Sequence, residues 1–311
     1  PVYMSGIGGD SVELTYIDDM GEEQKINAPK LGYYADRLRD TIKILDKGVV
    51  GSNLSWSVID SSTMGLIPLS GEGDKDGSQK DSGTGSFSDG DVAVLRVTSM
   101  AYDMESYEGT DYTAMENELR PRFEELKAKG IKKLVLDLRS NSGGSPYMIA
   151  ALAGIFAPAG EHVLSYAGVV DKKTANYVMD EKTGRYEIGG RITYEGKDLI
   201  PDIVVLVNAE TISAGDHMTA IVADYPNVTI MGFTKSNCSG QAVNGVAFDN
   251  EASLTFSAIP AMKEDGTFFV DSGIDHVGQV PIDIKVPFDE EAMTSLFVEG
   301  EDYLLKCAVE Y

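Results

Sequence analysis

The chain has 311 residues, with 50 acidic against 26 basic side chains and a formal net charge of −24 at pH 7. That length is enough for one large or two modest globular domains. The acidic balance argues against a nucleic acid as partner, because binding to phosphates needs a basic face. No apolar stretch approaches the ~20 residues of a membrane span.

The first ninety residues predict small elements rather than a large core. Residues 11–17 and 24–28 alternate in hydropathy, which predicts a β-hairpin. Apolar side chains recur at helical spacing over residues 34–45, and two short strands are expected near 54–60 and 65–69. The stretch 70–91 is rich in Gly, Ser and Asp, which predicts a flexible insertion.

From residue 91 onward, predicted strands alternate with predicted helices, with a β-rich excursion in between. Pro121 predicts a kink or restart of its helix. Strands that alternate with helices imply a largely parallel sheet covered on both faces, so the expected fold class is α/β. The expected elements are strand 92–97, helix 111–129, strand 132–138, helix 145–157, excursion 162–197, strand 202–208, helix 213–224, strand 228–232, strands around 243–270, and helices 289–297 and 300–309.

Ser213 follows a short β-branched run and stands directly before a predicted helix. A strand–turn–helix junction sets a side-chain oxygen at the carboxyl edge of a sheet, beside the unpaired N–H groups of the helix start. A nucleophile and an oxyanion site can be built together at such a place. Ser213 could also be an ordinary N-cap, with Asp216 completing a capping-box-like pattern. Taken alone, the capping interpretation is favoured.

A second junction of the same shape favours the catalytic interpretation. The segment Lys133–Gly144 runs from a buried strand into Asn-x-Gly-Gly, where glycines leave the backbone N–H groups uncrowded. Together with the Ala214 amide, this turn would supply two donors to one oxyanion. An acyl-transfer enzyme is therefore the leading hypothesis. It requires the Ser213 hydroxyl to lie within about one helix diameter (~10 Å) of the diglycine turn.

Asp137 and Arg139 close the strand before the diglycine turn. We expect Asp137 to hold the loop by hydrogen bonds rather than to take part in catalysis. Arg139 either pairs with Asp137 or meets a substrate carboxylate, and the structural role is favoured.

The proton acceptor for Ser213 is less defined in the sequence. The three histidines, His162, His217 and His276, are each expected to be surface or loop residues rather than the base. Lys235 follows the strand after the Ser213 helix and could reach back across adjacent strand ends. A lysine acts as a base only if burial lowers its pKa from about 10.4 toward neutrality.

At these residues the chain resembles the S41 peptidases, the family of the C-terminal processing proteases and the tricorn core protease. The resemblance covers roughly residues 91–286. The matching motifs are Val92-Ala-Val-Leu-Arg-Val97, Leu134-Val-Leu-Asp-Leu-Arg-Ser-Asn-Ser-Gly-Gly144, Thr211-Ile-Ser-Ala-Gly-Asp216 and Phe269-Val-Asp-Ser-Gly-Ile-Asp275. The family implies a ClpP/crotonase-like catalytic domain, with a mostly parallel sheet flanked by helices.

The resemblance implies that Ser213 is the nucleophile and that Gly143 or Gly144 forms the oxyanion hole with Ala214. The chain departs from the processing proteases at their lysine base, because Cys238 occupies that slot and Lys235 stands three residues earlier. Tricorn-like members instead use an upstream histidine supported by an acidic residue, and Asp271 occupies the acidic position. The base is therefore either Lys235 or a histidine that precedes Pro1, and the second is slightly favoured.

The sequence thus predicts a serine peptidase that hydrolyses a peptide or protein substrate through an acyl-enzyme, without a metal or organic cofactor. The alternative is a non-catalytic relative that binds peptides or small ligands in the same groove. Residues 1–30 resemble the remnant of a PDZ-like module. Residues 31–90 would lead into a peptidase domain over 91–311. The family implies an extracytoplasmic location, whether secreted, periplasmic or envelope-anchored. The oligomeric state stays open.

Overall fold

The computed structural model divides into two compact units, Pro1–Lys47 and Gly48–Tyr311, and each is described by itself. The predicted helix near residues 34–45 and the predicted insertion 70–91 lie outside the described residues. So do Cys238, Asp271 and His276. The structure describes residues 11–17, 22–29, 54–60, 65–68, 92–100, 112–174, 176–179, 192–196, 200, 202–237, 242–247, 253–263, 265–270, 280 and 282–311.

The first unit contains the predicted hairpin. Strands β1 (Ser11–Ile17) and β2 (Glu23–Pro29) pair antiparallel, with Leu14 opposite Ile26. The alternating pattern is therefore confirmed as a pair of strands. The kinship of this segment with a PDZ-like module stays a prediction.

Within the described part of the second unit, seven strands form one sheet in the order β16-β12-β11-β6-β5-β3-β4. The strands from β16 to β5 run parallel, and β3 and β4 are antiparallel, which confirms the expected mostly parallel sheet. The strands are β3 (Leu54–Asp60), β4 (Gly65–Pro68), β5 (Val92–Val97), β6 (Lys133–Asp137), β11 (Asp202–Leu206), β12 (Val228–Gly232) and β16 (Ile284–Lys285).

The sheet begins earlier in the chain than the expected peptidase domain. That domain is expected to start at residue 91, and β3 pairs with the whole of β5, from Leu54 opposite Val97 to Ile59 opposite Val92. The compact unit accordingly starts at Gly48. Local composition does not reveal this pairing between distant segments, and the start of the peptidase domain at residue 91 stays a prediction.

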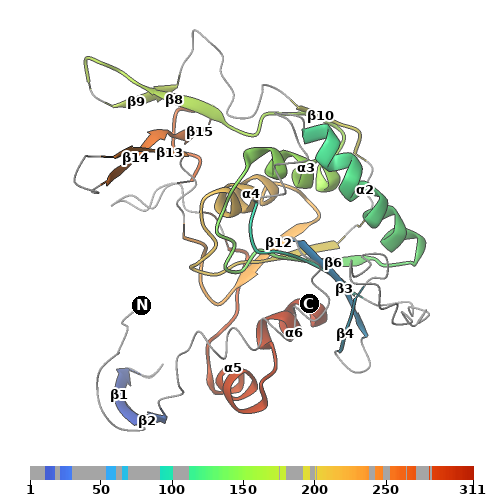
Figure 1. Cartoon of the computed structure of the whole chain (residues 1–311). Helices are drawn as coiled ribbons and strands as arrows, with labels where there is room; N and C mark the ends of the chain where they lie inside the picture. The colour runs from blue at the N-terminus through green and yellow to red at the C-terminus, as the bar shows by residue number, and fades with distance from the viewer. Residues whose placement is uncertain are drawn as a thin grey trace. The chain divides into compact units, whose positions relative to one another are not determined.

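Five α-helices are described, and they cover the two faces of the sheet (Figure 1). Helices α2, α3 and α4 lie on one face, whereas α5 and α6 lie on the other. Helix α2 runs unbroken through Pro121, so the predicted restart is wrong. The predicted helix 289–297 is α5 followed by a π-helix, η1. The bounds are α2 (Tyr112–Ala128), α3 (Pro146–Phe156), α4 (Ala214–Val222), α5 (Glu290–Thr294), η1 (Ser295–Glu299) and α6 (Tyr303–Glu310).

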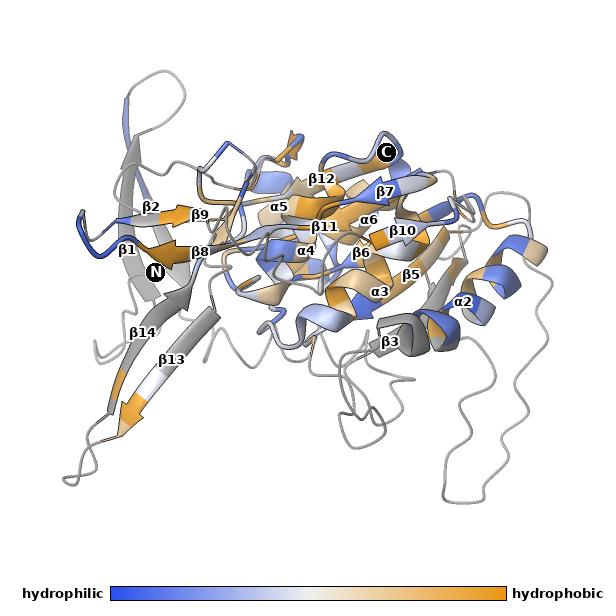
Figure 2. Ribbon diagram, turned by 90° about the horizontal axis from the view of Figure 1, so that it is seen from above, coloured by the Kyte–Doolittle hydropathy of each residue, from blue (hydrophilic) through white to orange (hydrophobic). Residues whose placement is uncertain are grey.

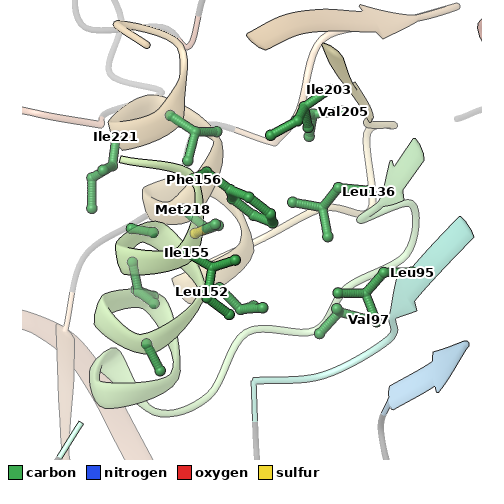
Figure 3. Close-up of a cluster of buried hydrophobic side chains, with 14 of the residues drawn as sticks. Leu95, Val97, Leu136, Leu152, Ile155, Phe156, Ile203, Val205, Met218 and Ile221 are labelled. Carbon is green, nitrogen blue, oxygen red and sulfur yellow. The ribbon is translucent and has the colours of Figure 1, made fainter. Parts of the chain in front are cut away.

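The main hydrophobic core lies between the sheet and helices α2 to α4. Figure 3 shows Leu136 and Ile203 from neighbouring strands facing Phe156 of α3 and Met218 of α4, and all four are buried. The central strands are mostly apolar because both of their faces are covered (Figure 2). Burial of each such large side chain contributes roughly 1.5–3 kcal/mol. This core fixes the positions of the strand ends, from which the loops of interest emerge.

The expected β-rich excursion is also present. Strand β7 (Gly160–His162) pairs with β10 (Ile192–Tyr194), and β8 (Tyr166–Val170) lies between β9 (Tyr177–Met179) and β15 (Ala261–Met262). The hairpin β13–β14 comprises Ala242–Ala247 and Ser253–Ile259. In the part of the chain that the structure describes, no helix is long and apolar enough to cross a membrane.

Candidate active site

Ser213 occupies the N-cap position of α4 in a conformation that serine rarely adopts. Its φ is 55° and its ψ is −120°, and its side chain makes no capping hydrogen bond. A non-glycine residue held at positive φ carries roughly 1–3 kcal/mol of strain, which the surrounding structure must offset. The interpretation of Ser213 as an ordinary capping serine is therefore wrong.

The Ser213 hydroxyl lies against the diglycine turn. A Cβ atom built on Gly143 would stand 2.9 Å from Ser213 Oγ and 3.1 Å from the Ala214 nitrogen. Gly143 itself has a φ of +83°, which a glycine adopts without strain. The expected meeting of the two junctions is confirmed. Ser213 is half-buried rather than sealed in the core.

Asn141 joins these two junctions from a fully buried position. Its side-chain Nδ2 donates to the Val97 carbonyl at 2.7 Å, and its Oδ1 accepts the Gly143 N–H at 2.9 Å. Its backbone carbonyl accepts the Ile212 N–H at 2.9 Å. One residue thereby holds the end of β5, the diglycine turn and the segment before Ser213 together. The Asn-x-Gly-Gly motif is visible in the sequence, but its spacing alone assigns no role to this side chain.

A second set of hydrogen bonds links the loop after β6, at residues 138–140, to the loop after β11, at residues 208–211. The buried Thr211 hydroxyl donates to the Leu138 carbonyl at 2.8 Å. Asn208 Oδ1 accepts the Ser140 N–H at 2.8 Å, and Asn208 Nδ2 donates to Ser140 Oγ at 3.1 Å. Ser140 also has a positive φ, of 57°. These contacts hold the two loops in register from the strand ends to the nucleophile.

The peptide unit between Gly143 and Gly144 has a defined orientation. The Gly143 carbonyl accepts the Met100 N–H at 2.7 Å and the Ser99 hydroxyl at 3.2 Å. The described peptide bonds are trans, so the Gly144 N–H points away from residues 99 and 100. Among the described residues, no hydrogen bond engages the N–H of Gly144 or Ala214. Gly143 is buried and Gly144 is exposed.

Asp137 and Arg139 form a structural ion cluster with Asp302 at the N-cap of α6. Arg139 Nη2 lies 2.7 Å from Asp137 Oδ2 and 2.6 Å from Asp302 Oδ2. Burial alone would raise the pKa of Asp137, but the charge and hydrogen bonds of Arg139, with the charge of Arg96, hold it below its usual value. The structural roles of Asp137 and Arg139 are confirmed. Asp302 was not foreseen, although Asp before an apolar helix is a recognisable N-cap.

The candidate bases differ in how far they are buried. Lys235 is exposed, although its segment adjoins the nucleophile loop, where the Asn237 N–H donates to the Thr211 carbonyl at 2.9 Å. His217 was expected to lie on the surface, which is wrong: it is only 2 % exposed, and its ring centroid is 5.1 Å from that of Phe269. The burial reflects the packing of Phe269 over α4.

His162 is also packed rather than displayed on the surface. It is half-buried between Tyr194 and Tyr225, with its Nε2 2.9 Å from the Pro158 carbonyl oxygen. Asp271 lies outside the described residues. In the described part of the chain, no cluster of three or more His, Cys, Asp or Glu residues could hold a metal ion.

A family model, Peptidase family S41, matches residues 91–277. The carboxy-terminal processing protease CtpA of Bacillus subtilis is 26% identical over 157 residues, which are 50% of this chain and 30% of that protein. A protein described as a CtpA-like serine protease in Staphylococcus aureus strain N315 is 28% identical over 145 residues, 47% of this chain and 26% of that protein. The chain therefore spans less than a third of these curated relatives.

Two solved structures share the fold. A candidate peptidase from Parabacteroides merdae has a TM-score of 0.53 at 14% identity, covering 89% of this chain and 69% of that one. Mature CPAF in complex with lactacystin has a TM-score of 0.51 at 13% identity, and the match covers 98% of this chain and 68% of CPAF. At such identities the likeness concerns the fold alone. It agrees with the mixed α/β architecture and the mostly parallel sheet expected from the sequence.

Proposed function

This chain belongs to peptidase family S41, and we propose that it hydrolyses peptide bonds through an acyl-enzyme on Ser213. The observation that carries the proposal is the placement of Ser213: its hydroxyl caps no helix, its backbone is strained, and it lies against the diglycine turn. Strain of this kind is retained where it serves a function. An ordinary helix start would use the hydroxyl as a cap and adopt an unstrained φ.

In the proposed reaction, Ser213 Oγ attacks the carbonyl carbon of the scissile peptide bond. The carbonyl oxygen becomes an oxyanion, and the backbone N–H groups of Gly144 and Ala214 donate hydrogen bonds to it. Removing one such donor typically lowers the rate by about 10²–10³-fold. The amine then leaves with a proton, and water releases the acyl group from Ser213.

Three features favour Gly144 over Gly143 as the donor from the turn. The Gly143 N–H is already used by Asn141 Oδ1. The Gly144 N–H points away from residues 99 and 100, and the turn that follows β6 lies between the ends of β5 and β11. The N–H is therefore directed toward the Ser213 side. Gly144 is exposed, so a ligand oxygen can reach it.

The reaction also needs a group that takes the proton from Ser213 and delivers it to the leaving amine. The two proposed acceptors are Lys235 and a histidine supplied from elsewhere in the protein, with Asp271 as the supporting acid of the second. The exposure of Lys235 supports the histidine, because a lysine base requires burial. An extracytoplasmic location stays a prediction from the family.

A fluorophosphonate probe tests the assignment of Ser213 on the full-length protein. The expected result is covalent labelling that disappears in Ser213→Ala, while the free energy of unfolding stays close to that of the parent protein. Peptide hydrolysis should disappear with the labelling. An unlabelled full-length protein would overturn the proposal and would indicate a peptide-binding relative without catalysis.

A further inference from the structure

We propose that Asn141 is a positioning residue that selects which amide of the diglycine turn faces the oxyanion. The inference rests on the proposed function of Ser213. It goes further by assigning a task to a buried side chain that touches neither the substrate nor the reacting atoms. Asn141 acts through Gly143, Gly144 and the segment before Ser213.

The first step concerns the competition between two neighbouring amides. Gly143 and Gly144 each carry an N–H, and only one can face the ligand while the other is satisfied by the protein. Asn141 Oδ1 takes the Gly143 N–H at 2.9 Å in a buried position. An unpaired buried N–H would be unfavourable, so this bond holds Gly143 inward. The N–H of Gly144, a residue that is exposed, remains as the donor of the turn.

The second step concerns the direction of the peptide plane. Asn141 fixes the plane before Gly143, and the bonds of Met100 and Ser99 to the Gly143 carbonyl fix the plane after it. The two planes that flank Gly143 are thus held from opposite sides. The direction of the Gly144 N–H is set before any substrate arrives. Preorganisation of this kind is what makes an oxyanion donor effective.

The third step concerns the spacing between the turn and the nucleophile. The Asn141 carbonyl accepts the Ile212 N–H, one residue before Ser213. A Cβ atom built on Gly215 in the first turn of α4 would stand only 2.9 Å from Asn141 Oδ1. Asn141 is therefore in close contact with both ends of the nucleophile junction. Its backbone carbonyl and its side chain both contact the junction that carries the Ala214 amide.

Asparagine meets these requirements because its side chain is both a donor and an acceptor in one plane. Nδ2 serves the Val97 carbonyl while Oδ1 serves the Gly143 N–H. An aspartate would lack the donor and place a negative charge near the developing oxyanion. A leucine would fill the space but leave both backbone groups unpaired.

The test compares Asn141→Ala with Thr211→Val in saturation kinetics with the fluorophosphonate probe. Asn141→Ala removes the buried side-chain bonds to the Val97 carbonyl and the Gly143 N–H, and it keeps the backbone bond to the Ile212 N–H. Thr211→Val removes the buried bond to the Leu138 carbonyl, which joins the same two loops without contacting the Gly143 amide. We expect Asn141→Ala to lower the maximal labelling rate on the order of 10²-fold, with the probe's affinity nearly unchanged. The fall for Thr211→Val should be much smaller. If the maximal labelling rate fell equally in the two variants, Asn141 would have only a structural role, and the proposal would be overturned.

Tyr194→Phe provides the control for stability. It removes a buried hydrogen bond to the Ala150 carbonyl at 2.9 Å, away from the turn and the nucleophile. It should lower the melting temperature without changing the labelling rate. If the parent protein is not labelled at Ser213, the proposed function fails, and this inference fails with it. If labelling is normal and only the Asn141 effect is missing, the inference alone fails.

A measurement on the unmutated protein keeps the proposal testable if Asn141→Ala does not fold. NMR of protein labelled with ¹⁵N-glycine can follow the Gly143 and Gly144 amide protons before and after phosphonylation. We expect the Gly144 proton to shift downfield, because it gains a charged acceptor, and the Gly143 proton to stay in place. A shift of Gly143 instead would show that the other amide faces the oxyanion.

Discussion

Gly143 and Ser213 lie so close together that a Cβ atom built on the glycine would stand 2.4 Å from the serine Cβ. The turn can therefore approach the nucleophile only because the residue at 143 has no side chain. This single contact links the loop after β6 to the start of α4. It also explains why a glycine, rather than any small residue, stands at that position.

We predict that Gly143→Ala lowers the rate of fluorophosphonate labelling of Ser213 by at least about 10²-fold. The new methyl group would push the turn and the nucleophile apart. Gly266→Ala is the matched control, because Gly266 has nearly the same φ of +82° but nothing within 4 Å of a built Cβ. It carries the same backbone strain, roughly 1–2 kcal/mol, without the collision. Normal labelling of Gly143→Ala would contradict the close contact.

The strained backbone of Ser213 predicts a difference in stability between two inactive variants. Ser213→Gly relieves the strain at φ 55°, whereas Ser213→Ala does not. The extra chain entropy of glycine in the unfolded state opposes the gain by about 0.5–1 kcal/mol. We expect the free energy of unfolding of Ser213→Gly, measured with urea, to be higher than that of Ser213→Ala by about 1 kcal/mol. A less stable glycine variant would mean that the backbone there is not strained.

The ion cluster predicts a pH-dependent loss of stability in Arg139→Met. Because Arg139 holds the pKa of Asp137 below its usual value, Asp137 stabilises the fold above about pH 4, and this contribution is lost as the pH falls through the lower folded-state pKa. Without Arg139, burial leaves an uncompensated charge, and the free energy of unfolding at pH 7 should fall by about 3–5 kcal/mol. The unfolded state titrates alike in both proteins, so the gap between variant and parent should narrow as the pH falls from the folded-state pKa of Asp137 in the variant, which burial raises once Arg139 is gone, to its lowered folded-state pKa in the parent. Urea unfolding across this pH range measures it.

Asp302→Asn is the control for that experiment. Asparagine can still cap α6, so the variant removes only the outer charge and leaves the Asp137–Arg139 pair in place. Its loss of stability should be smaller than that of Arg139→Met. A larger loss would place the main partner of Arg139 at Asp302.

Gly215→Ala tests the packing of Asn141 against α4. In an open helical position, this substitution would stabilise a protein by about 1 kcal/mol. Here the Cβ would stand 2.9 Å from Asn141 Oδ1 and 3.1 Å from its Cγ, so we expect a loss of about 1–3 kcal/mol. In an Asn141→Ala background the contacts with Oδ1 and Cγ are gone and only the contact with Cβ, at 3.2 Å, remains, so the same substitution should cost clearly less. Additive effects in this double-mutant cycle would show that the two residues do not contact each other.

Lys235→Ala separates the two candidate bases. Lys235 is exposed, which does not provide the burial that a lysine base requires, so labelling should persist in the variant. The labelling rate of the parent protein should then rise with pH through about 6.5, the usual pKa of histidine. Loss of labelling in Lys235→Ala would instead support Lys235 as the base of a Ser–Lys dyad.

Local patterns in the sequence were enough to place most of the elements around the site. β-Branched runs became the central strands, and helical periodicity after Ser213 became α4. The two junctions could be paired in advance because the carboxyl ends of parallel strands meet at one edge of a sheet. The short strand β16 was missed because two residues carry no pattern.

The sequence by itself determined the α/β architecture, the strand ends, and the choice of Ser213 and the diglycine turn as partners, because periodicity and turn chemistry act over a few residues. Only the tertiary structure revealed the strained serine, the buried Asn141 and the bond from Arg139 to Asp302, a partner 163 residues away in the chain. Such contacts depend on how distant strands and helices pack, and no local spacing encodes them. The sequence therefore identifies the main residues of the candidate site, but the geometry of the site depends on the packing of the fold.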